Sequence, residues 1–505
     1  MVGGIAVDES TPLQASVESA SSGSWSKCGR GRFPILVGFI FASFPAFLFG
    51  YDISATSGAI TSIGLSYGKA GLSSGQAAVL SSGSLIGATV SSVAVFWIGP
   101  VLGRRGELML GSFFYLLGTI ITCVANQALP YTCVLVGRIV YGLGIALSMH
   151  GAPIFISEIA PPDIRGLLIA GKESFVVGGM AVGYAIAWGT DVPSMLRTRW
   201  LYLWIPPGAI AILNFVVHYF YLHPSPRWLT LRGRRDEAVA ALRFYRPEAD
   251  DASIQKEVAE MDEVVLAAPS KPPASSGGAD GAKTEDLREK EDEDASSASL
   301  FVEMLTHRRA LIAGLGLIIL QQLTGQPAVL YSTEDIFRNA GFRSSGAESS
   351  FIVGIAKLIA TMVSGLLVDR AGRRPLLLVG ITLMVFALVF LSVGVAFRWN
   401  ACVLAMMILY VVAYQVGFGP VTWLVISEVF PLRTRTQALS VSVVVNFGLN
   451  LVMVMTNSAM VHGMGLYAVF ALFACLSLVS ILFVWFFVPE TKGKTLEEIE
   501  AMLAL

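Results

Sequence analysis

The sequence predicts an all-α membrane protein with twelve transmembrane helices in two pseudo-symmetric six-helix bundles. The 505-residue chain is 54% hydrophobic and only 14% charged, whereas charged residues make up roughly a quarter of a soluble globular protein. Twelve of its stretches approach the roughly 20 apolar residues that a helix needs to cross a bilayer. Motifs of the first half also recur in the second half, which indicates a duplicated unit.

The apolar stretches form two groups of six. They lie at 34–57, 76–99, 107–126, 131–153, 167–189 and 201–222, and then at 310–331, 351–369, 376–397, 402–427, 437–460 and 465–488. This spacing predicts a flexible tail at 1–33, a bundle at 34–222, a loop at 223–308, a second bundle at 309–488 and a tail at 489–505. Inside the loop, 235–246 and 252–268 have the pattern of short amphipathic helices. The stretch 269–298, rich in Ser, Pro, Gly, Asp and Glu, is predicted to be disordered.

Two repeated motifs support the duplication. Gly-Arg-Arg at 103–105 recurs 269 residues later at 372–374, and the Glu-x-x-Pro motif at Glu158 recurs 270 residues later at Glu428. The two offsets agree, and each motif falls at the same end of the same-numbered span in its half. Duplicated halves are a common construction of transporters.

The charges in the loops predict the orientation. Fourteen Lys and Arg residues fall on one side of the predicted membrane and six on the other. Because positive loops stay in the cytoplasm, both termini and the central loop are expected to be cytoplasmic.

Composition also argues against several classes of protein. The net charge of −1 offers no basic surface for nucleic acid. The five cysteines are scattered without Cys-x-x-Cys spacing, so neither a metal site nor a cofactor is expected. No nucleophile–base arrangement is evident, and we expect no enzymatic activity.

Ionisable residues inside predicted spans are the most informative. Asp52 lies in the first span and Arg138 in the fourth. A charge at this depth is costly and normally faces a partner or a water-filled cavity. A carboxylate beside a guanidinium can change protonation as solvent access alternates, so the pair is a candidate for proton coupling. A static ion pair that holds two helices together is the alternative.

A second set of charges lies at the predicted cytoplasmic ends of the spans. Such residues can form networks that hold one face closed and break when it opens, and the duplicated acid and base positions imply that they pair with each other. Such charges also serve as simple topological signals. The candidates for this gating role are Arg104, Arg105, Glu158, Arg165, Asp369, Arg373, Arg374, Glu428, Arg433 and Glu490.

Polar and aromatic residues interrupt the seventh and tenth spans. Amides donate and accept hydrogen bonds at once, which suits a ligand rich in hydroxyl groups, and an indole offers a flat apolar face to a sugar ring. Gly and Pro break both spans, as happens at transporter binding sites. Hydrogen bonding between helices is the alternative role. The residues concerned are Gln321, Gln322, Gln326, Tyr331, Tyr414, Gln415 and Trp423.

In combination these motifs resemble the sugar porter family of the major facilitator superfamily. The similarity runs through essentially all twelve spans, and includes Gly-Tyr-Asp52, Gln321-Gln322-x-x-Gly, Asp369-Arg-x-Gly-Arg-Arg and Pro-Glu490-Thr-Lys-Gly. The stretch 149–153 is most similar to plant and algal members described as D-xylose-proton symporter-like, or as vacuolar and plastidic glucose transporters. The resemblance implies the major facilitator fold.

It also implies roles for individual residues. Asp52 would be the proton site with Arg138 as its partner, and Tyr331 would lie near the outer gate. Glu173 stands where the family usually has a sugar-binding Gln, and it could be a second protonatable group. His150 could be one too, with a hydrogen-bonded structural histidine as the alternative. The full expected sugar site is Glu173, Gln321, Gln322, Gln326, Tyr331, Tyr414, Gln415, Trp423 and Asn446.

Two departures from the family pattern affect the first half. Pro100-Val101 replaces the usual Asp-Arg, and His223-Pro224 replaces the usual Pro-Glu. The amino-terminal gate is therefore expected to be weaker than the carboxy-terminal one.

The expected function is proton-coupled transport of a monosaccharide, with glucose favoured, by a monomeric unit in the bilayer. A facilitative uniporter for a sugar or polyol and a non-transporting sugar sensor are the alternatives. The plasma membrane, the vacuole and the plastid envelope all remain open as its location.

Overall fold

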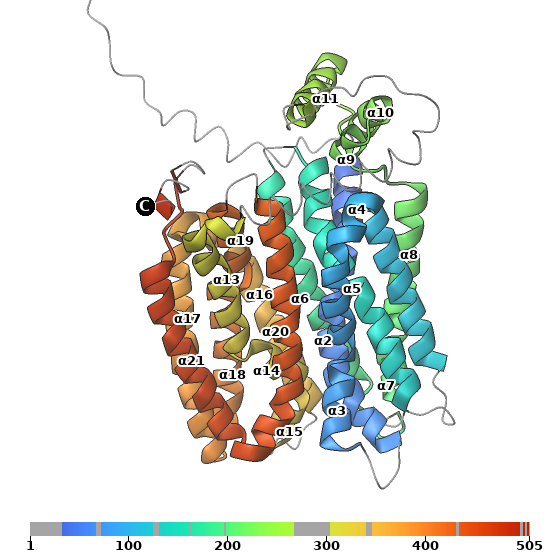
Figure 1. Ribbon diagram of the computed structural model, residues 1–505. Coiled ribbons are helices and arrows are strands. Elements are labelled where there is room, and N and C mark those ends of the chain that lie inside the picture. The colour runs from blue at the N-terminus through green and yellow to red at the C-terminus, as the bar shows by residue number, and fades with distance from the viewer. Residues whose placement is uncertain are drawn as a thin grey trace, which may run out of the picture.

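The helices of the protein stand side by side as two bundles (Figure 1). The computed structural model describes residues 33–66, 72–124, 131–161, 164–195, 198–266, 304–339, 346–430, 434–494, 498–499 and 502–503. Residues 1–32 of the predicted tail, residues 267–268 of the second predicted loop helix and the predicted disordered stretch 269–298 lie outside these ranges.

The first bundle contains α2 to α8, and the second contains α13 to α21. The first comprises α2 (Phe33–Ser66), α3 (Ser74–Ser81), α4 (Gly83–Val124), α5 (Tyr131–Ile159), α6 (Arg165–Gly189), α7 (Arg199–Trp204) and α8 (Pro206–Phe220). The second comprises α13 (Arg308–Leu323), α14 (Gln326–Tyr331), α15 (Thr333–Asn339), α16 (Gly346–Ala371), α17 (Arg373–Ala396), α18 (Asn400–Gly417), α19 (Gly419–Val429), α20 (Arg435–Met464) and α21 (Leu466–Phe487).

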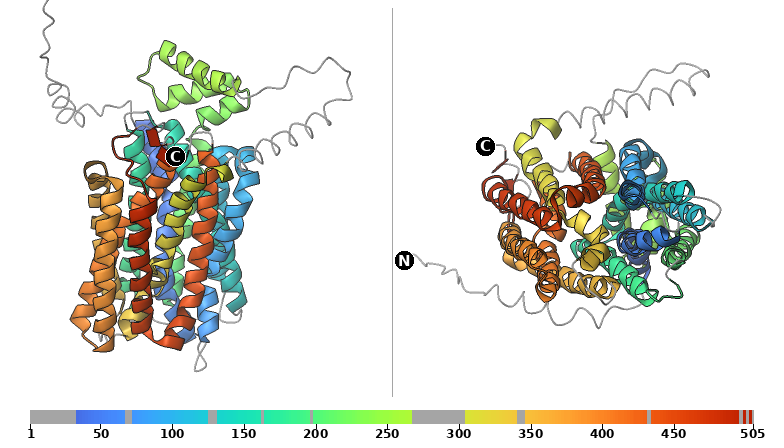
Figure 2. Two further views of the ribbon diagram at one scale, coloured as in Figure 1. Left: turned by 60° about the vertical axis from the view of Figure 1, so that its left-hand side comes forward. Right: turned by 90° about the horizontal axis from the view of Figure 1, so that it is seen from below.

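Three short helices between the bundles mark one end of the molecule. These are α9 (Pro226–Leu231), α10 (Arg235–Tyr245) and α11 (Asp251–Leu266), and the C-terminus lies at the same end (Figures 1 and 2). We call this the α10 end and the opposite one the α15 end. Two amphipathic helices were predicted here, and α10 and α11 confirm them within the described residues.

Ten helical segments are long and apolar enough to cross a membrane, and they reconcile with the twelve predicted spans. The 42-residue segment α4 contains two of those spans, which meet at a kink at Gly103, where the backbone is not helical (φ 68°, ψ 167°). Helix α6 supplies the remaining span. Lys172 and Glu173 lie within it and lower its mean hydropathy.

The predicted breaks in the seventh and tenth spans are confirmed. Helix α13 ends at Leu323 and α14 begins at Gln326, with Gly325 between them at a φ of 89°. Only glycine adopts this left-handed conformation without strain, and a Cβ at this position would meet the Phe473 ring at 2.3 Å. In the tenth span, α18 ends at Gly417 and α19 begins at Gly419.

Helix α2 is longer than predicted. The apolar pattern placed its end at residue 57, whereas the helix continues to Ser66. Its last turns carry polar residues, and Ser57 and Ser62 among them are buried. A hydropathy scan misses such turns, because their polar groups are satisfied inside the protein and not by water.

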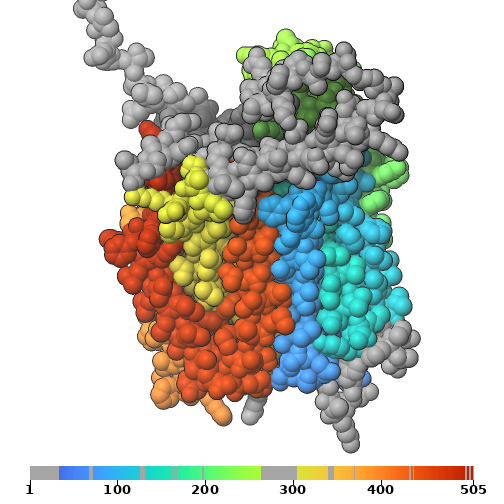
Figure 3. Space-filling view, viewed as in Figure 1, coloured from blue at the N-terminus to red at the C-terminus, as the bar shows by residue number. Residues whose placement is uncertain are grey.

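The two bundles meet along α20, which lies against α3 and α4 of the first bundle (Figure 3). Helices α6 and α16 pack together in the same way elsewhere in the interface. There the Trp188 ring stacks on Phe351 with 5.4 Å between centroids. These contacts run between the bundles and must change if the bundles move relative to each other.

Candidate functional site

A buried ion pair joins α2 to α5 in the first bundle. Asp52 and Arg138 are each only 2% exposed. Both terminal nitrogens of the guanidinium donate to the carboxylate, Nη2 at 3.0 Å from Oδ2. The Ser84 hydroxyl of α4 donates to the same Oδ2 at 2.7 Å, and Arg138 Nη2 donates to the Thr56 hydroxyl at 2.6 Å. Three helices thus supply the hydrogen bonds that offset the desolvation of the two charges.

This ion pair borders the second bundle. The Phe49 ring, one turn before Asp52, packs edge to face on Phe447 of α20 at 5.7 Å. Tyr331, the last residue of α14, is buried and lies within electrostatic range of Asp52 and Arg138. A change in the charge of Asp52 is therefore felt by residues of the other bundle.

Glutamine side chains are buried around the breaks of the seventh and tenth spans. Gln321 Nε2 donates to the Phe418 carbonyl, where α18 gives way to α19, at 3.0 Å. Gln322 Oε1 and Gln415 Nε2 are also buried and have no hydrogen-bond partner among the residues described. Most buried polar atoms in folded proteins are paired. An acceptor and a donor left open here are available to a polar ligand.

The other expected sugar-site residues are distributed over five helices. Glu173 lies on α6, Gln326 and Tyr331 on α14, Tyr414 on α18, Trp423 on α19 and Asn446 on α20. Glu173 lies within electrostatic range of Lys357 on α16, whose Nζ is 5.4 Å from the centre of the Tyr414 ring. Lys357 is buried and was not anticipated from the sequence. That these side chains form a single sugar site stays a prediction.

At the α10 end, the duplicated acid of the second half has its expected partner. Arg373 Nη2 lies 3.0 Å from Glu428 Oε1, and the Thr491 hydroxyl donates to Glu428 Oε2 at 2.6 Å. Glu490 accepts hydrogen bonds at 3.1 Å from the backbone nitrogens of Arg373 and Arg374, which begin α17. A carboxylate at a helix N-terminus is electrostatically favourable.

The first half is built differently. Glu158 accepts a hydrogen bond from the Ser225 hydroxyl, but Arg104 forms its ion pair with Glu107, one turn further along α4, at 2.7 Å. Arg105 donates to two backbone carbonyls at the end of α8. The duplicated acid and base therefore form an ion pair in the second half only. In the first half Arg104 bonds to Glu107 and not to Glu158.

The gating role of these residues stays a prediction. Each ion pair described above lies within one bundle, so none of them bridges the interface. The side chains of Arg165 and Asp369 and the whole of Arg433 lie outside the described residues.

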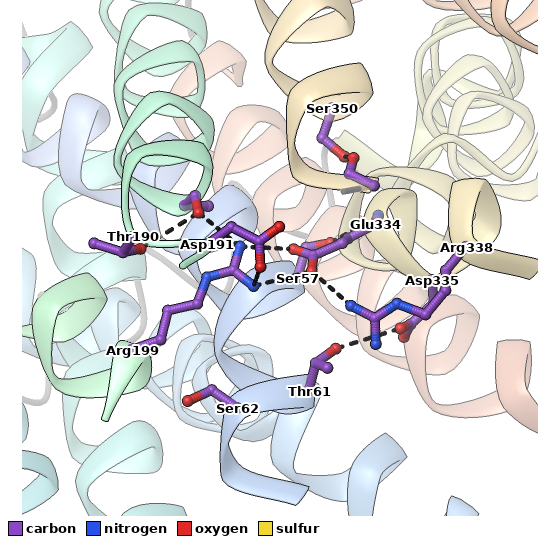
Figure 4. A network of polar contacts seen from close by, with 12 residues as sticks. Ser57, Thr61, Ser62, Thr190, Asp191, Arg199, Glu334, Asp335, Arg338 and Ser350 are labelled. Atoms are coloured by element: carbon purple, nitrogen blue, oxygen red, sulfur yellow. Dashed lines mark hydrogen bonds and ion pairs between the residues drawn. The ribbon is translucent and has the colours of Figure 1, made fainter. Parts of the chain in front are cut away.

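At the α15 end, an ion-pair cluster does bridge the two bundles (Figure 4). Arg199 of α7 makes two bonds to Glu334 of α15, Nη1 to Oε1 at 3.0 Å and Nη2 to Oε2 at 3.1 Å. Arg338 Nη2 also donates to Glu334 Oε1 at 3.0 Å. Asp191 lies 3.4 Å from Arg199 on the first-bundle side. We call these four residues the α15 cluster.

Further hydrogen bonds between the bundles surround this cluster. They are Ser57 with the Glu334 backbone, Thr61 with Asp335, Tyr184 with Leu330 and Thr333, and Ser74 with His462. Away from this end, His150 of α5 lies 3.5 Å from Ser440 of α20. The ion-pair cluster and the hydrogen bonds around it close the interface at the α15 end.

Residues 38–503 match the protein family described as Sugar (and other) transporter. The chain belongs to the sugar transporter family. One relative, the D-xylose-proton symporter-like 1 of Arabidopsis thaliana, is 38% identical over 485 residues, which cover 92% of this chain and 90% of the relative. The glucose facilitated diffusion protein of Zymomonas mobilis is 30% identical, with 92% and 96% covered.

Solved structures show the same fold for this sugar transporter family member. The partially occluded, inward-open xylose transporter XylE from E. coli has a TM-score of 0.73 and 24% sequence identity. The alignment covers 91% of this chain and 99% of that one. The predicted major facilitator fold with twelve spans in two bundles is thereby confirmed.

Sequence reasoning missed three features of this transporter, which are the Arg199–Glu334 pair, Glu107 and Lys357. Arg199 was counted only as a loop charge, and Glu334 was not singled out although it directly follows a span. Glu107 was also overlooked, although an acid three residues after Arg104 on one helix face signals an ion pair. Lys357 carried a signal too, since a lone lysine inside an apolar span needs a partner.

Proposed function

We propose that this protein is a proton-coupled symporter that carries a monosaccharide across a membrane by alternating access. One observation carries the proposal. The buried Asp52–Arg138 pair lies beside the bundle interface, and the bundle across that interface holds two amide atoms, Gln322 Oε1 and Gln415 Nε2, that have no partner among the described residues. A titratable site next to a polar ligand site is what coupling requires.

In the proposed cycle, Asp52 takes up a proton while the α15 end is open. Neutralising the carboxylate weakens its hydrogen bonds to Arg138 and leaves the Arg138 guanidinium without an opposite charge. Sugar hydroxyls then pair with Gln322 Oε1 and Gln415 Nε2, and the bundles close at the α15 end through Arg199 and Glu334. Opening at the α10 end releases the sugar and the proton. No covalent chemistry takes part, and the protein is not an enzyme.

Orientation and location follow from charge and from relatives. The α10 end carries the larger number of Lys and Arg residues, so we place it in the cytoplasm together with both termini. A chloroplastic relative in Arabidopsis, 37% identical, favours an organelle envelope as one of the possible membranes. The transport unit is proposed to be a monomer, because the two bundles of one chain enclose the pathway.

The proposed substrates are glucose and xylose. A proton:xylose symporter of this fold, 25% identical with a TM-score of 0.71, has been solved with a bromodeoxy derivative of D-glucose bound. Relatives described as putative polyol transporter 2 of Arabidopsis thaliana and myo-inositol transporter 1 of Candida albicans are each 29% identical, so inositol and sugar alcohols belong in any competition panel.

The test is uptake of radiolabelled glucose and xylose into proteoliposomes, with and without a pH gradient. We expect sugar to accumulate against its gradient only when a proton gradient is imposed. Asp52→Asn should retain exchange of sugar for sugar but lose accumulation, whereas Asp236→Asn on the exposed face of α10 should behave as the wild type. An initial rate of sugar uptake that does not change with the pH gradient, together with no accumulation of sugar, would contradict proton coupling.

Facilitated diffusion is the second candidate, because a relative of this chain is named for it. In that case the Asp52–Arg138 pair is purely structural. Asp52→Asn would then leave both exchange and net flux down a gradient unchanged, and the wild type would not accumulate sugar.

A further inference from the structure

A buried histidine–glutamate pair connects α4 and α5 and has no part in the cycle proposed above. His150 Nδ1 lies 2.8 Å from Glu107 Oε2, and the other carboxylate oxygen accepts from Arg104 Nη1 at 2.7 Å. Glu107 is fully buried and His150 is 8% exposed. Residues this costly to bury inside a membrane protein are usually functional.

Two glycines make room for this carboxylate. A Cβ added at Gly99 would meet Glu107 Oε1 at 2.9 Å, and one added at Gly151 would meet Oε2 at 3.0 Å. Both distances are shorter than an unstrained carbon–oxygen contact. Any larger residue at either position would displace the acid from His150 or from Arg104. The local backbone is therefore shaped around the Glu107 side chain.

The second nitrogen of the same histidine faces the other bundle. His150 Nε2 lies 3.5 Å from the Ser440 hydroxyl of α20. This polar contact joins the two bundles away from the α15 end. It lies toward the α10 end, because His150 is in the last third of α5 and Ser440 is near the start of α20.

The hydrogen bonds of His150 show which ring nitrogen carries the hydrogen atom when the imidazole is neutral. A carboxylate only accepts hydrogen bonds, so Nδ1 carries the hydrogen that points at Glu107, and Nε2 is left as the atom that gains or loses a proton. While α5 and α20 touch, Ser440 covers Nε2. When the bundles separate at the α10 end, water reaches it.

We propose that His150, held by Glu107, is a second proton-binding site whose access is controlled by the contact with Ser440. It is distinct from Asp52 and titrates from the α10 side. The charged groups around it are Glu107 and Arg104 on α4. Further toward the α10 end lie Glu158, which interacts with Arg104 and Glu107, and Arg227, which interacts with Glu158. Helix α20 presents the uncharged Ser440 hydroxyl.

The direction of the pH effect follows from access to Nε2. With the interface closed Ser440 covers this atom, whereas water reaches it once the bundles part at the α10 end, so proton uptake accompanies the open state. Acid therefore favours the state in which the bundles are parted at the α10 end. A carrier held in that state cycles more slowly, so exchange should slow as the pH falls.

The experiment measures sugar-for-sugar exchange in proteoliposomes with the same pH on both sides, and it rests on the proposed transport function. Asp52→Asn removes the first proton site and isolates the second. In this background we expect the initial exchange rate to fall about fivefold from pH 7.5 to pH 5.5, the range in which histidine side chains change their charge. Adding His150→Gln should reduce the fall to less than about twofold.

Two matched variants serve as controls. His218→Gln replaces another buried histidine of the same bundle, whose Nδ1 bonds to a backbone carbonyl, and it should leave the fivefold fall in place. Glu107→Gln keeps the shape of the acid but removes its charge, so the midpoint of the fall should move to lower pH. A fall that persists unchanged in the His150→Gln variant would overturn the proposal.

A second readout needs no sugar. Val443→Cys, one turn along α20 from Ser440, reports the opening of this interface through labelling by a membrane-impermeant thiol reagent in a background without native cysteines. Labelling should accelerate in acid when His150 is present and should not respond in His150→Gln. Equal acceleration of labelling by acid with His150 present and in His150→Gln would overturn the second proton site. Absence of sugar exchange by the wild type at every pH would contradict only the transport function.

Discussion

Arg199 and Glu334 form a two-bonded ion pair that joins the first bundle to the second at the α15 end. Both side chains are almost completely buried, and the bonds measure 3.0 and 3.1 Å. Gly58 of α2 passes so close that a Cβ there would lie 3.2 Å from Arg199 and 3.3 Å from Glu334. Charges desolvated in this way cannot be separated without water, so the pair can part only when the α15 end opens.

Glu334→Gln should therefore favour the open α15 end. The substitution leaves Arg199 as a buried charge without its main partner, and breaking a buried pair in this way costs about 3–5 kcal/mol. Opening the interface to water relieves that cost. With Ser57→Cys as reporter in a cysteine-free background, labelling from the α15 side should accelerate by at least about tenfold.

Arg338→Gln is the control for this variant. Arg338 donates to the same carboxylate but is half exposed, and an exposed ion pair contributes only about 0–1 kcal/mol. Its effect on labelling should be within about threefold. Equal acceleration by the two variants would show that the buried pair is not what closes this end.

Arg138→Gln should destabilise the protein strongly. It leaves Asp52 buried with the Ser84 hydroxyl as its remaining described donor, and the expected cost is about 3–5 kcal/mol. The double variant with Asp52→Asn removes both charges and should recover part of that loss. Thermal unfolding of the detergent-purified proteins measures the difference, and a double variant less stable than Arg138→Gln would contradict an ion pair.

Gln322→Leu and Gln321→Leu should separate sugar binding from stability. Gln322 Oε1 has no partner among the described residues, so its loss should raise the KM for sugar while the melting temperature stays unchanged or rises. Gln321 bonds to the Phe418 carbonyl, and its loss should lower the melting temperature as well. A ligand hydrogen bond is worth about 1–3 kcal/mol, or a 5- to 150-fold change in KM. An unchanged KM for Gln322→Leu would remove it from the site.

Gly103→Ala and Gly372→Ala should each destabilise the protein. Gly103 has a φ of 68° and Gly372 a φ of 92°, and a Cβ would meet Trp228 at 2.6 Å or Glu490 at 2.9 Å. The backbone strain alone costs about 1–3 kcal/mol. Gly448→Ala in α20 is the matched control, because its Cβ would meet nothing within 4 Å. Its melting temperature should equal or exceed that of the wild type.

Much of the fold follows from the sequence, because a membrane imposes simple rules. Every span must be about 20 residues long and satisfy its own backbone hydrogen bonds, so apolar length alone locates the helices. The rules fail where a polar stretch is buried against protein, as at the end of α2. The helix breaks at Gly325 and Phe418 were predictable because Gly and Pro mark them.

The sequence by itself determined which residues are unusual, and tertiary structure alone decided how most of them pair. Asp52 and Arg138 stood out because a charge inside an apolar span demands a partner. Repetition of Glu158 and Glu428 suggested equivalent ion pairs, yet Arg104 pairs with Glu107, which is nearer. Arg199 and Glu334 are 135 residues apart and lie in ordinary-looking loop sequence. Only the packing of one bundle against the other brings such residues within bonding distance and removes the water between them.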